Sequence, residues 1–167
     1  MARHKVSITR VSGQDTYGAL QRAMSLIGDL RQIIPKNSRI LVKPNIVMAP
    51  TERKVTDPIV LDAVLRLASD TSPREIIIGE GSADSYTWSA YRLYNVYGMA
   101  SRYGARVVDL NECEGMRKDV PPELGREYVM LPRAVDEADI VISVPTYKLW
   151  MNELPMSLSL KNLFGLY

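Results

Sequence analysis

The stretch that decides the fold is ILVKPN at residues 40–45, in which three branched apolar residues continue directly into a lysine, a proline and an asparagine. Two further apolar stretches, 76–78 and 140–144, continue in the same way into the polar segments 79–82 and 145–148. Continuous apolar stretches are typical of strands buried on both faces, as in a parallel sheet covered by helices. Because the carboxyl ends of parallel strands share one edge of a sheet, we expect the polar residues that follow them to converge.

Helix patterns alternate with the strands along the chain. Apolar side chains spaced as on one helical face predict helices over 15–34, 57–68 and 87–103, the last of them broken near Gly98. Residues 111–127 are expected to be an irregular connection, followed by a short strand at 128–131. The strands expected in one largely parallel sheet are 6–10, 39–43, 75–79, 105–110 and 140–144. This alternation predicts an α/β fold, a three-layer sandwich with a mostly parallel sheet.

Length and composition predict one globular domain over residues 1–167. Its 46% hydrophobic and 24% charged residues are those of an ordinary globular protein, and the net charge of +2 is too small to favour nucleic acid as a partner. No apolar stretch approaches the roughly 18 residues that a membrane span requires. The N-terminus has no apolar region of the kind found in secretory signals. We therefore expect no membrane partner and a cytoplasmic location.

Several kinds of chemistry lack the residues that they need. The single cysteine, Cys113, allows neither an internal disulfide nor a cysteine-ligated iron–sulfur cluster within this chain, and its acidic neighbours should raise the pKa of the thiol. The single histidine, His4, allows neither a two-histidine metal site nor a Ser-His-Asp triad. No pair of carboxylates has metal-ligand spacing, so the sequence predicts no metal site and names no cofactor.

Lys43 and Glu80 each follow a buried strand and admit two interpretations. A lysine at a buried strand end requires either a ligand anion or a carboxylate partner. The functional interpretation is that Lys43 binds an anion. The structural alternative is an ion pair between Lys43 and Glu80 on neighbouring strands.

The segment Gly79-Glu80-Gly81-Ser82 could form a nest of backbone N–H groups for an anion. It matches neither G-x-G-x-x-G nor the P-loop pattern, and the alternative is a tight turn that leaves a strand. Lys148 and the pair Lys161-Asn162 complete the polar set, although solvated loop lysines are the ordinary alternative.

Taken together, these motifs resemble the family catalogued as domain of unknown function 362. The matching pieces, in the order of the family pattern, are Lys43-Pro44-Asn45, Thr56-Asp57-Pro58, Gly79-Glu80-Gly81-Ser82, Ala138-Asp139, a P-x-x-K at 145–148 and the closing S-L-K-N-x-F-G at 159–165. The closing motif is the most specific of them. The resemblance implies an α/β fold and an occasional association with iron–sulfur domains, and it implies no established reaction.

The chain departs from the family pattern at two places. The family commonly has K-x-H where this chain has Lys148-Leu149-Trp150, which raises the alternative of an inactive relative. Family members usually continue well past the closing motif, and this chain stops there. We therefore expect a fragment or a shortened relative of a longer protein, with the C-terminal part of the family pattern missing.

The leading hypothesis is a binding or catalytic site for a small anion, a phosphate or a carboxylate, at the carboxyl edge of the sheet. Glu80 and Lys148 are the candidate catalytic residues, with Glu80 either a general base or the group that positions a lysine. The candidate ligand-binding residues offer positive charge, amide groups or backbone N–H groups: Lys43, Asn45, Gly81, Ser82, Lys161 and Asn162.

A second hypothesis is a non-catalytic module that docks a redox partner, an iron–sulfur domain, another subunit or its own missing C-terminal domain. It is motivated by the apolar side chains Leu163, Phe164, Leu166 and Tyr167, which would favour burial in an interface. The sequence leaves open whether the protein is an enzyme.

Overall fold

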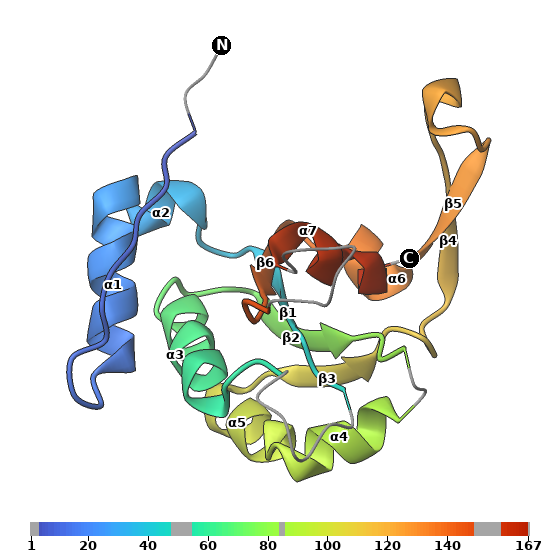
Figure 1. Cartoon of the computed structure of the whole chain (residues 1–167). Helices are drawn as coiled ribbons and strands as arrows, with labels where there is room; N and C mark the ends of the chain where they lie inside the picture. Colours follow the sequence, from blue (N-terminus) through green and yellow to red (C-terminus); the bar gives the residue numbers. More distant parts are fainter. Residues whose placement is uncertain (1–3, 48–54, 84–85, 149–157, 167) are drawn as a thin grey trace.

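The central layer of the structure is a parallel sheet with the strand order β3-β2-β1-β6, seen in a computed structural model that describes residues 4–47, 55–83, 86–148 and 158–166 (Figure 1). Its strands are β1 (Arg39–Pro44), β2 (Glu75–Glu80), β3 (Arg106–Asp109) and β6 (Ile140–Val144). In this register Lys43 of β1 lies opposite Ser143 of β6, and Glu80 of β2 lies opposite Asp109 of β3. The carboxyl ends of the strands therefore meet at one edge, as the sequence predicts.

Helices cover both faces of the sheet and confirm the α/β fold. Ile40 and Val42 face one side, where they pack with α3 (Pro58–Ser69), α4 (Thr87–Leu93) and α5 (Val96–Tyr103). Leu41 lies between them in sequence and faces the other side, with α6 (Arg133–Asp136) and the 3₁₀ turn η2 (Leu163–Leu166). The two inner strands, β1 and β2, are buried on both sides, which explains their continuous apolar stretches, whereas Val141 of the outer strand β6 is 39% exposed.

Capping side chains begin the helices where the sequence indicates. Asp57 accepts a hydrogen bond from the N–H of Ile59, and Pro58 is the first residue of α3. In the same way Asp15 accepts a hydrogen bond from Gly18 and begins α1 (Thr16–Ile27). No helix in the described ranges is long and apolar enough to cross a membrane.

The expected strand at 6–10 is wrong. These residues form no strand and lie along α1, where the hydroxyls of Ser7 and Thr9 donate to the helix carbonyls of Ala23 and Ala19, both at 2.8 Å (Figure 1). The apolar side chains of the alternating pattern point away from this contact, because Val6 and Ile8 are 86% and 90% exposed. Alternation of this kind predicts a strand, although here the residues pair with no strand and the polar side faces the protein.

The structure divides two of the expected helices at positions where the sequence does not predict a break. The helix expected over 15–34 ends at Gly28 and resumes as the short α2 (Leu30–Ile33), which Asp29 caps. The helix expected over 87–103 breaks at Asn95, whose φ of 54° is left-handed, whereas Gly98 lies inside α5. Asparagine tolerates this conformation better than most residues, so glycine was the wrong marker for the break.

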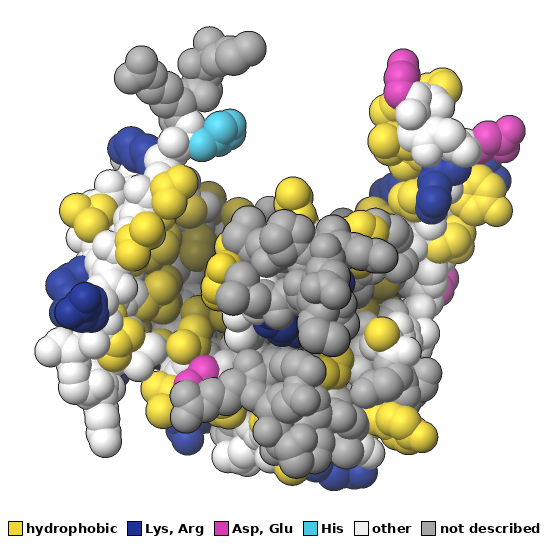
Figure 2. Space-filling model, in the orientation of Figure 1, with side chains coloured by type: hydrophobic (Ala, Val, Ile, Leu, Met, Phe, Trp, Pro, Cys, Tyr) yellow, Lys and Arg dark blue, Asp and Glu magenta, His cyan; other side chains and the backbone are white. Residues whose placement is uncertain are grey.

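The connection expected to be irregular contains an antiparallel hairpin. Its strands β4 (Gly115–Asp119) and β5 (Tyr128–Pro132) flank the turn η1 (Pro122–Leu124) and project away from the central sheet (Figure 1). The guanidinium carbon of Arg117 lies 4.1 Å from the centre of the Tyr128 ring and links the two strands. Charged and apolar side chains are mixed over this hairpin (Figure 2), so β4 has no continuous apolar signal.

Candidate functional site

A cavity of about 560 Å³ opens at the carboxyl edge of the sheet. Its described lining includes every candidate site residue of the sequence analysis: Lys43, Asn45, Glu80, Gly81, Ser82, Lys148, Lys161 and Asn162. These residues come from the ends of β1, β2 and β6 and from α7 (Ser159–Asn162). The predicted convergence is confirmed, while the chemical role of each residue stays a prediction.

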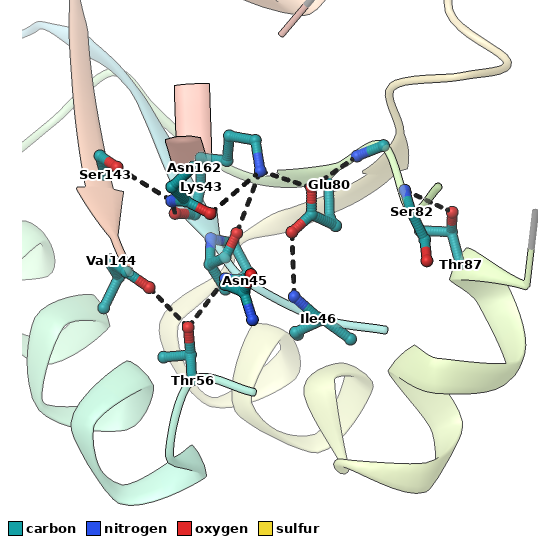
Figure 3. Close-up of polar contacts among 12 residues, drawn as sticks. Lys43, Asn45, Ile46, Thr56, Glu80, Ser82, Thr87, Ser143, Val144 and Asn162 are labelled. Atoms are coloured by element: carbon teal, nitrogen blue, oxygen red, sulfur yellow. Dashed lines mark hydrogen bonds and ion pairs between the residues drawn. The ribbon is translucent and has the colours of Figure 1, made fainter. Parts of the chain in front are cut away.

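A buried ion pair forms the floor of the cavity. The ammonium of Lys43 donates to Oε1 of Glu80, and these residues are only 2% and 4% exposed (Figure 3). Oε1 also accepts a hydrogen bond from the N–H of Gly81, and Oε2 accepts one from Ile46, both at 2.9 Å. The Glu80 carboxylate thus joins the end of β1 to the turn after β2. The ion pair that the structural alternative predicts is therefore present in the fold.

Burial governs the proton affinity of Glu80. Removal of the carboxylate from water raises its pKa, while the ammonium of Lys43 and the N–H groups of Ile46 and Gly81 oppose the rise without cancelling it. The raised pKa means that dehydration of the charged carboxylate costs more than its partners return. The pair is therefore a positioning device more than a source of stability.

Asn162 fastens the C-terminal segment onto the sheet. Its Nδ2 donates to the carbonyl of Lys43 at 3.1 Å and to the hydroxyl of Ser143 at 2.9 Å, while its Oδ1 lies 3.5 Å from Nζ of Lys43 (Figure 3). A buried amide with partners on both β1 and β6 fixes α7 above those strands. The described part of the C-terminal segment, 158–166, therefore packs internally and carries Lys161 and Asn162 to the cavity, whereas 156, 157 and 167 lie outside the described residues.

Gly165 lies against the ion pair. A Cβ atom placed on Gly165 would lie 3.0 Å from Oε1 of Glu80 and 3.1 Å from Nζ of Lys43, closer than ordinary van der Waals contact. The closing motif therefore contributes a glycine to the floor of the cavity because a larger residue would displace one of the two charges.

The variant Gly165→Ala is expected to lower the free energy of unfolding by about 1–3 kcal/mol, because the added methyl group overpacks a buried ion pair. Urea denaturation measures the change. Gly28→Ala is the matched control, since its Cβ would meet nothing nearer than a methyl group of Ile33 at 4.0 Å. Equal stability of the Gly165 variant and the parent would show that Gly165 does not lie in close contact with the Lys43–Glu80 ion pair.

A second polar network holds the ends of β1 and β6 together. Nζ of Lys148 donates to Oδ1 of Asn45 at 3.2 Å. The N–H of Asn45 donates to the hydroxyl of Thr56 at 2.8 Å, and this hydroxyl donates to the carbonyl of Val144 (Figure 3). These bonds orient the Asn45 amide and place the ammonium of Lys148 at the cavity.

The turn after β2 uses backbone N–H groups that the sequence analysis assigned to an anion. The N–H of Gly81 donates to Glu80, and that of Ser82 donates to the hydroxyl of Thr87 at 3.3 Å. The side chain of Asn111 donates to the carbonyl of Ser82 at 3.0 Å. This geometry agrees with the tight-turn alternative, and anion binding by Gly81 and Ser82 stays a prediction.

The sequence analysis missed four residues that shape the site. Asn111 carries a signal that could have been used, since it follows β3 as Asn45 follows β1. Thr56 was assigned only to a helix start, and Ser143 lies inside an apolar strand where nothing distinguishes it. Gly165 was part of the closing motif, but sequence cannot show what a glycine approaches.

Other candidate residues contribute little here. Cys113 has a raised pKa chiefly because of burial, with smaller effects from its acidic neighbours, which corrects the cause expected from sequence. Trp150 lies outside the described residues. Within the described ranges, no three or more histidine, cysteine, aspartate or glutamate side chains form a group that could hold a metal ion.

The fold and the cavity define an α/β domain with a lysine-rich site at the carboxyl edge of a parallel sheet. The chain belongs to the family described as Domain of unknown function (DUF362), whose family model matches residues 40–167. The match includes both β1 and the C-terminal segment that closes the cavity. No curated protein and no solved structure matched the chain.

Proposed function

We propose that the cavity binds a small anionic molecule, a phosphate or a carboxylate. The observation that supports this function is the charge of the described lining, which includes three lysines, Lys43, Lys148 and Lys161, and a single carboxylate, that of Glu80. Lys43 is paired with Glu80, and Lys148 and Lys161 bring two further ammonium groups to the described lining. Placement outside the carboxyl ends of parallel strands is the usual position for a ligand in this class of fold.

Each residue has a distinct role in this proposal. Lys148 and Lys161 attract the anion, and Lys148 is the better candidate for catalysis because its ammonium can stabilise charge that develops on a bound molecule. The amides of Asn45 and Asn162 orient the ligand-binding elements through the bonds described above. Glu80 acts as a positioning residue rather than as a general base, since both of its oxygens already accept hydrogen bonds.

Removal of the positive charge of Lys148 or of Lys161 is expected to weaken binding of inorganic phosphate or acetate. For Lys148→Ala and Lys161→Ala we expect a loss of about 1.5–3 kcal/mol, the usual worth of a hydrogen bond to a charged group. Isothermal titration calorimetry on the full chain measures this loss. Lys36→Ala is the matched control, because that exposed lysine precedes β1 and so lies at the opposite edge of the sheet.

Two results would contradict the proposal. The first is that neither inorganic phosphate nor acetate binds the parent protein. The second is that both bind equally well to the parent and to the two cavity variants, which would place any anion site elsewhere.

The alternative function, a module that docks a protein partner, has weaker support. Two of the apolar side chains that motivated it are withdrawn into the molecule, since Leu166 is buried and Leu163 packs against the same core cluster. Phe164 does remain 64% exposed, and Tyr167 lies outside the described residues. Because Phe164 lines the cavity, its exposure also has an explanation within the ligand-binding proposal.

A further inference from the structure

The described lining of the cavity combines lysines with apolar side chains. β6 lies at one side of the sheet and β3 at the other. Lys148 follows β6 and donates to Asn45 at the end of β1. Leu110 follows β3, and Pro132 at the end of β5 also lines the cavity. Lys148 and Leu110 therefore follow strands at opposite sides of the sheet, and apolar residues also follow β1 and β6 in the lining, at Ile46 and Pro145.

The C-terminal segment crosses the cavity from the β6 side of the sheet toward the β3 side. Asn162 is bonded to β6 and β1, Gly165 lies against Glu80 at the end of β2, and Leu166 packs in the core cluster that contains Val108 of β3. Figure 3 shows Ser143, Lys43 and Glu80 in this order across the sheet. Lys161 and Phe164 are three positions apart in this segment, and both line the cavity.

We propose that the ligand is an amphiphilic anion, a phosphate or carboxylate attached to an aromatic or alkyl body. This inference rests on the proposed function and adds the chemical class of the ligand. The anionic group lies at Lys148 and Lys161, and the apolar body lies toward Phe164, Leu110 and Pro132. Phe164 is 64% exposed in the wall of the cavity, so a flat or alkyl body would remove its ring from water.

The size of the cavity supports this class. A volume of about 560 Å³ lies within the range of about 300–1,000 Å³ that is typical of pockets for drug-sized ligands. Such pockets combine apolar side chains with polar groups that fix orientation, and the described lining holds both. The lysines alone would account for an inorganic anion, but the apolar side chains of the lining would then contact no ligand.

The test compares phenyl phosphate with inorganic phosphate, and benzoate with acetate, by isothermal titration calorimetry on the full chain. We expect the aromatic member of each pair to bind at least about tenfold more tightly, since an aromatic contact contributes roughly that factor. Phe164→Ala should remove about tenfold of the phenyl phosphate affinity and change the inorganic phosphate affinity by less than about twofold. Lys161→Ala should weaken both.

Two further variants separate loss of the Phe164 contact from a general effect on the C-terminal segment. Leu160→Ala is the matched control, because Leu160 belongs to the same segment, is 82% exposed and is not part of the described lining. Phe164→Leu retains an apolar side chain and should recover part of the phenyl phosphate affinity, which a misfolded variant could not do.

The outcomes separate this inference from the proposed function. If inorganic phosphate or acetate binds through Lys161 but the aromatic probes bind no more tightly, the amphiphilic ligand is wrong and the anion site stands. If phenyl phosphate binds equally well to the parent, to Lys148→Ala and to Lys161→Ala, the site does not recognise an anion and both proposals fail.

Discussion

Replacement of either member of the buried ion pair, by Lys43→Met or by Glu80→Gln, is expected to lower the free energy of unfolding by about 3–5 kcal/mol. Lys43 and Glu80 are almost fully buried, so each variant leaves the remaining charge in the interior of the protein without its ion-pair partner. In Glu80→Gln the ammonium of Lys43 loses its carboxylate. In Lys43→Met the carboxylate retains only the N–H groups of Ile46 and Gly81.

The double variant Lys43→Met/Glu80→Gln should be more stable than either single variant, because it removes both charges from the interior. The raised pKa of Glu80 points the same way, since dehydration of the carboxylate outweighs its attraction to Lys43. Urea denaturation of the four proteins of this cycle measures the coupling. Asp119→Asn, which breaks the exposed pair with Arg117, is the control and should change stability by less than about 0.5 kcal/mol. Additive single effects would show that the two charges do not depend on each other.

The variant Leu166→Ala is expected to lower the free energy of unfolding by about 2–5 kcal/mol, the usual cost of a cavity left by a buried leucine. Leu166 packs with Leu41, Ile77, Val108 and Leu110 on the second face of the sheet. Its loss should also loosen the segment that holds Lys161, Asn162 and Gly165 at the cavity. We therefore expect binding of inorganic phosphate to weaken together with stability.

Leu160→Ala is the matched control for this prediction, because it removes the same side chain from an exposed position of the same segment. Calorimetric titration and urea denaturation of both variants give the two readouts. Destabilisation of Leu166→Ala with unchanged phosphate affinity would show that the C-terminal segment stabilises the fold without shaping the site. Equal effects of the two leucine variants would show that Leu166 is not an anchor.

The central sheet and the convergence of the site were predictable because both depend on burial. Strands covered on both faces must be apolar throughout, so the stretches at 40–42 and 76–78 stand out in the sequence. The outer strand at 140–144 is also apolar, although Val141 is 39% exposed. Polar residues directly after such strands must lie at the edge that the parallel order creates. Lys43, Glu80 and Lys148 were therefore brought to one cavity by topology alone.

The remaining features were not predictable because they depend on contacts rather than on patterns. Residues 6–10 alternate like a strand, yet their hydroxyl groups bond to the carbonyls of α1. The strand β4 is mostly exposed and charged, so it has no apolar periodicity. The role of Gly165 depends on its approach to Glu80 from a distant part of the chain, which no local signal records.

The bonds of Asn162 set an order in which the cavity can be assembled during synthesis. Lys43 and Glu80 are separated by 37 positions, whereas Lys43 and Asn162 are separated by 119. A ribosome therefore releases both members of the ion pair long before it releases the segment that covers them. Closure of so long a loop carries an entropic cost that only the completed contacts can offset. The two charges can thus pair while the site is still open to water, and they are dehydrated only after residues 158–166 have been made.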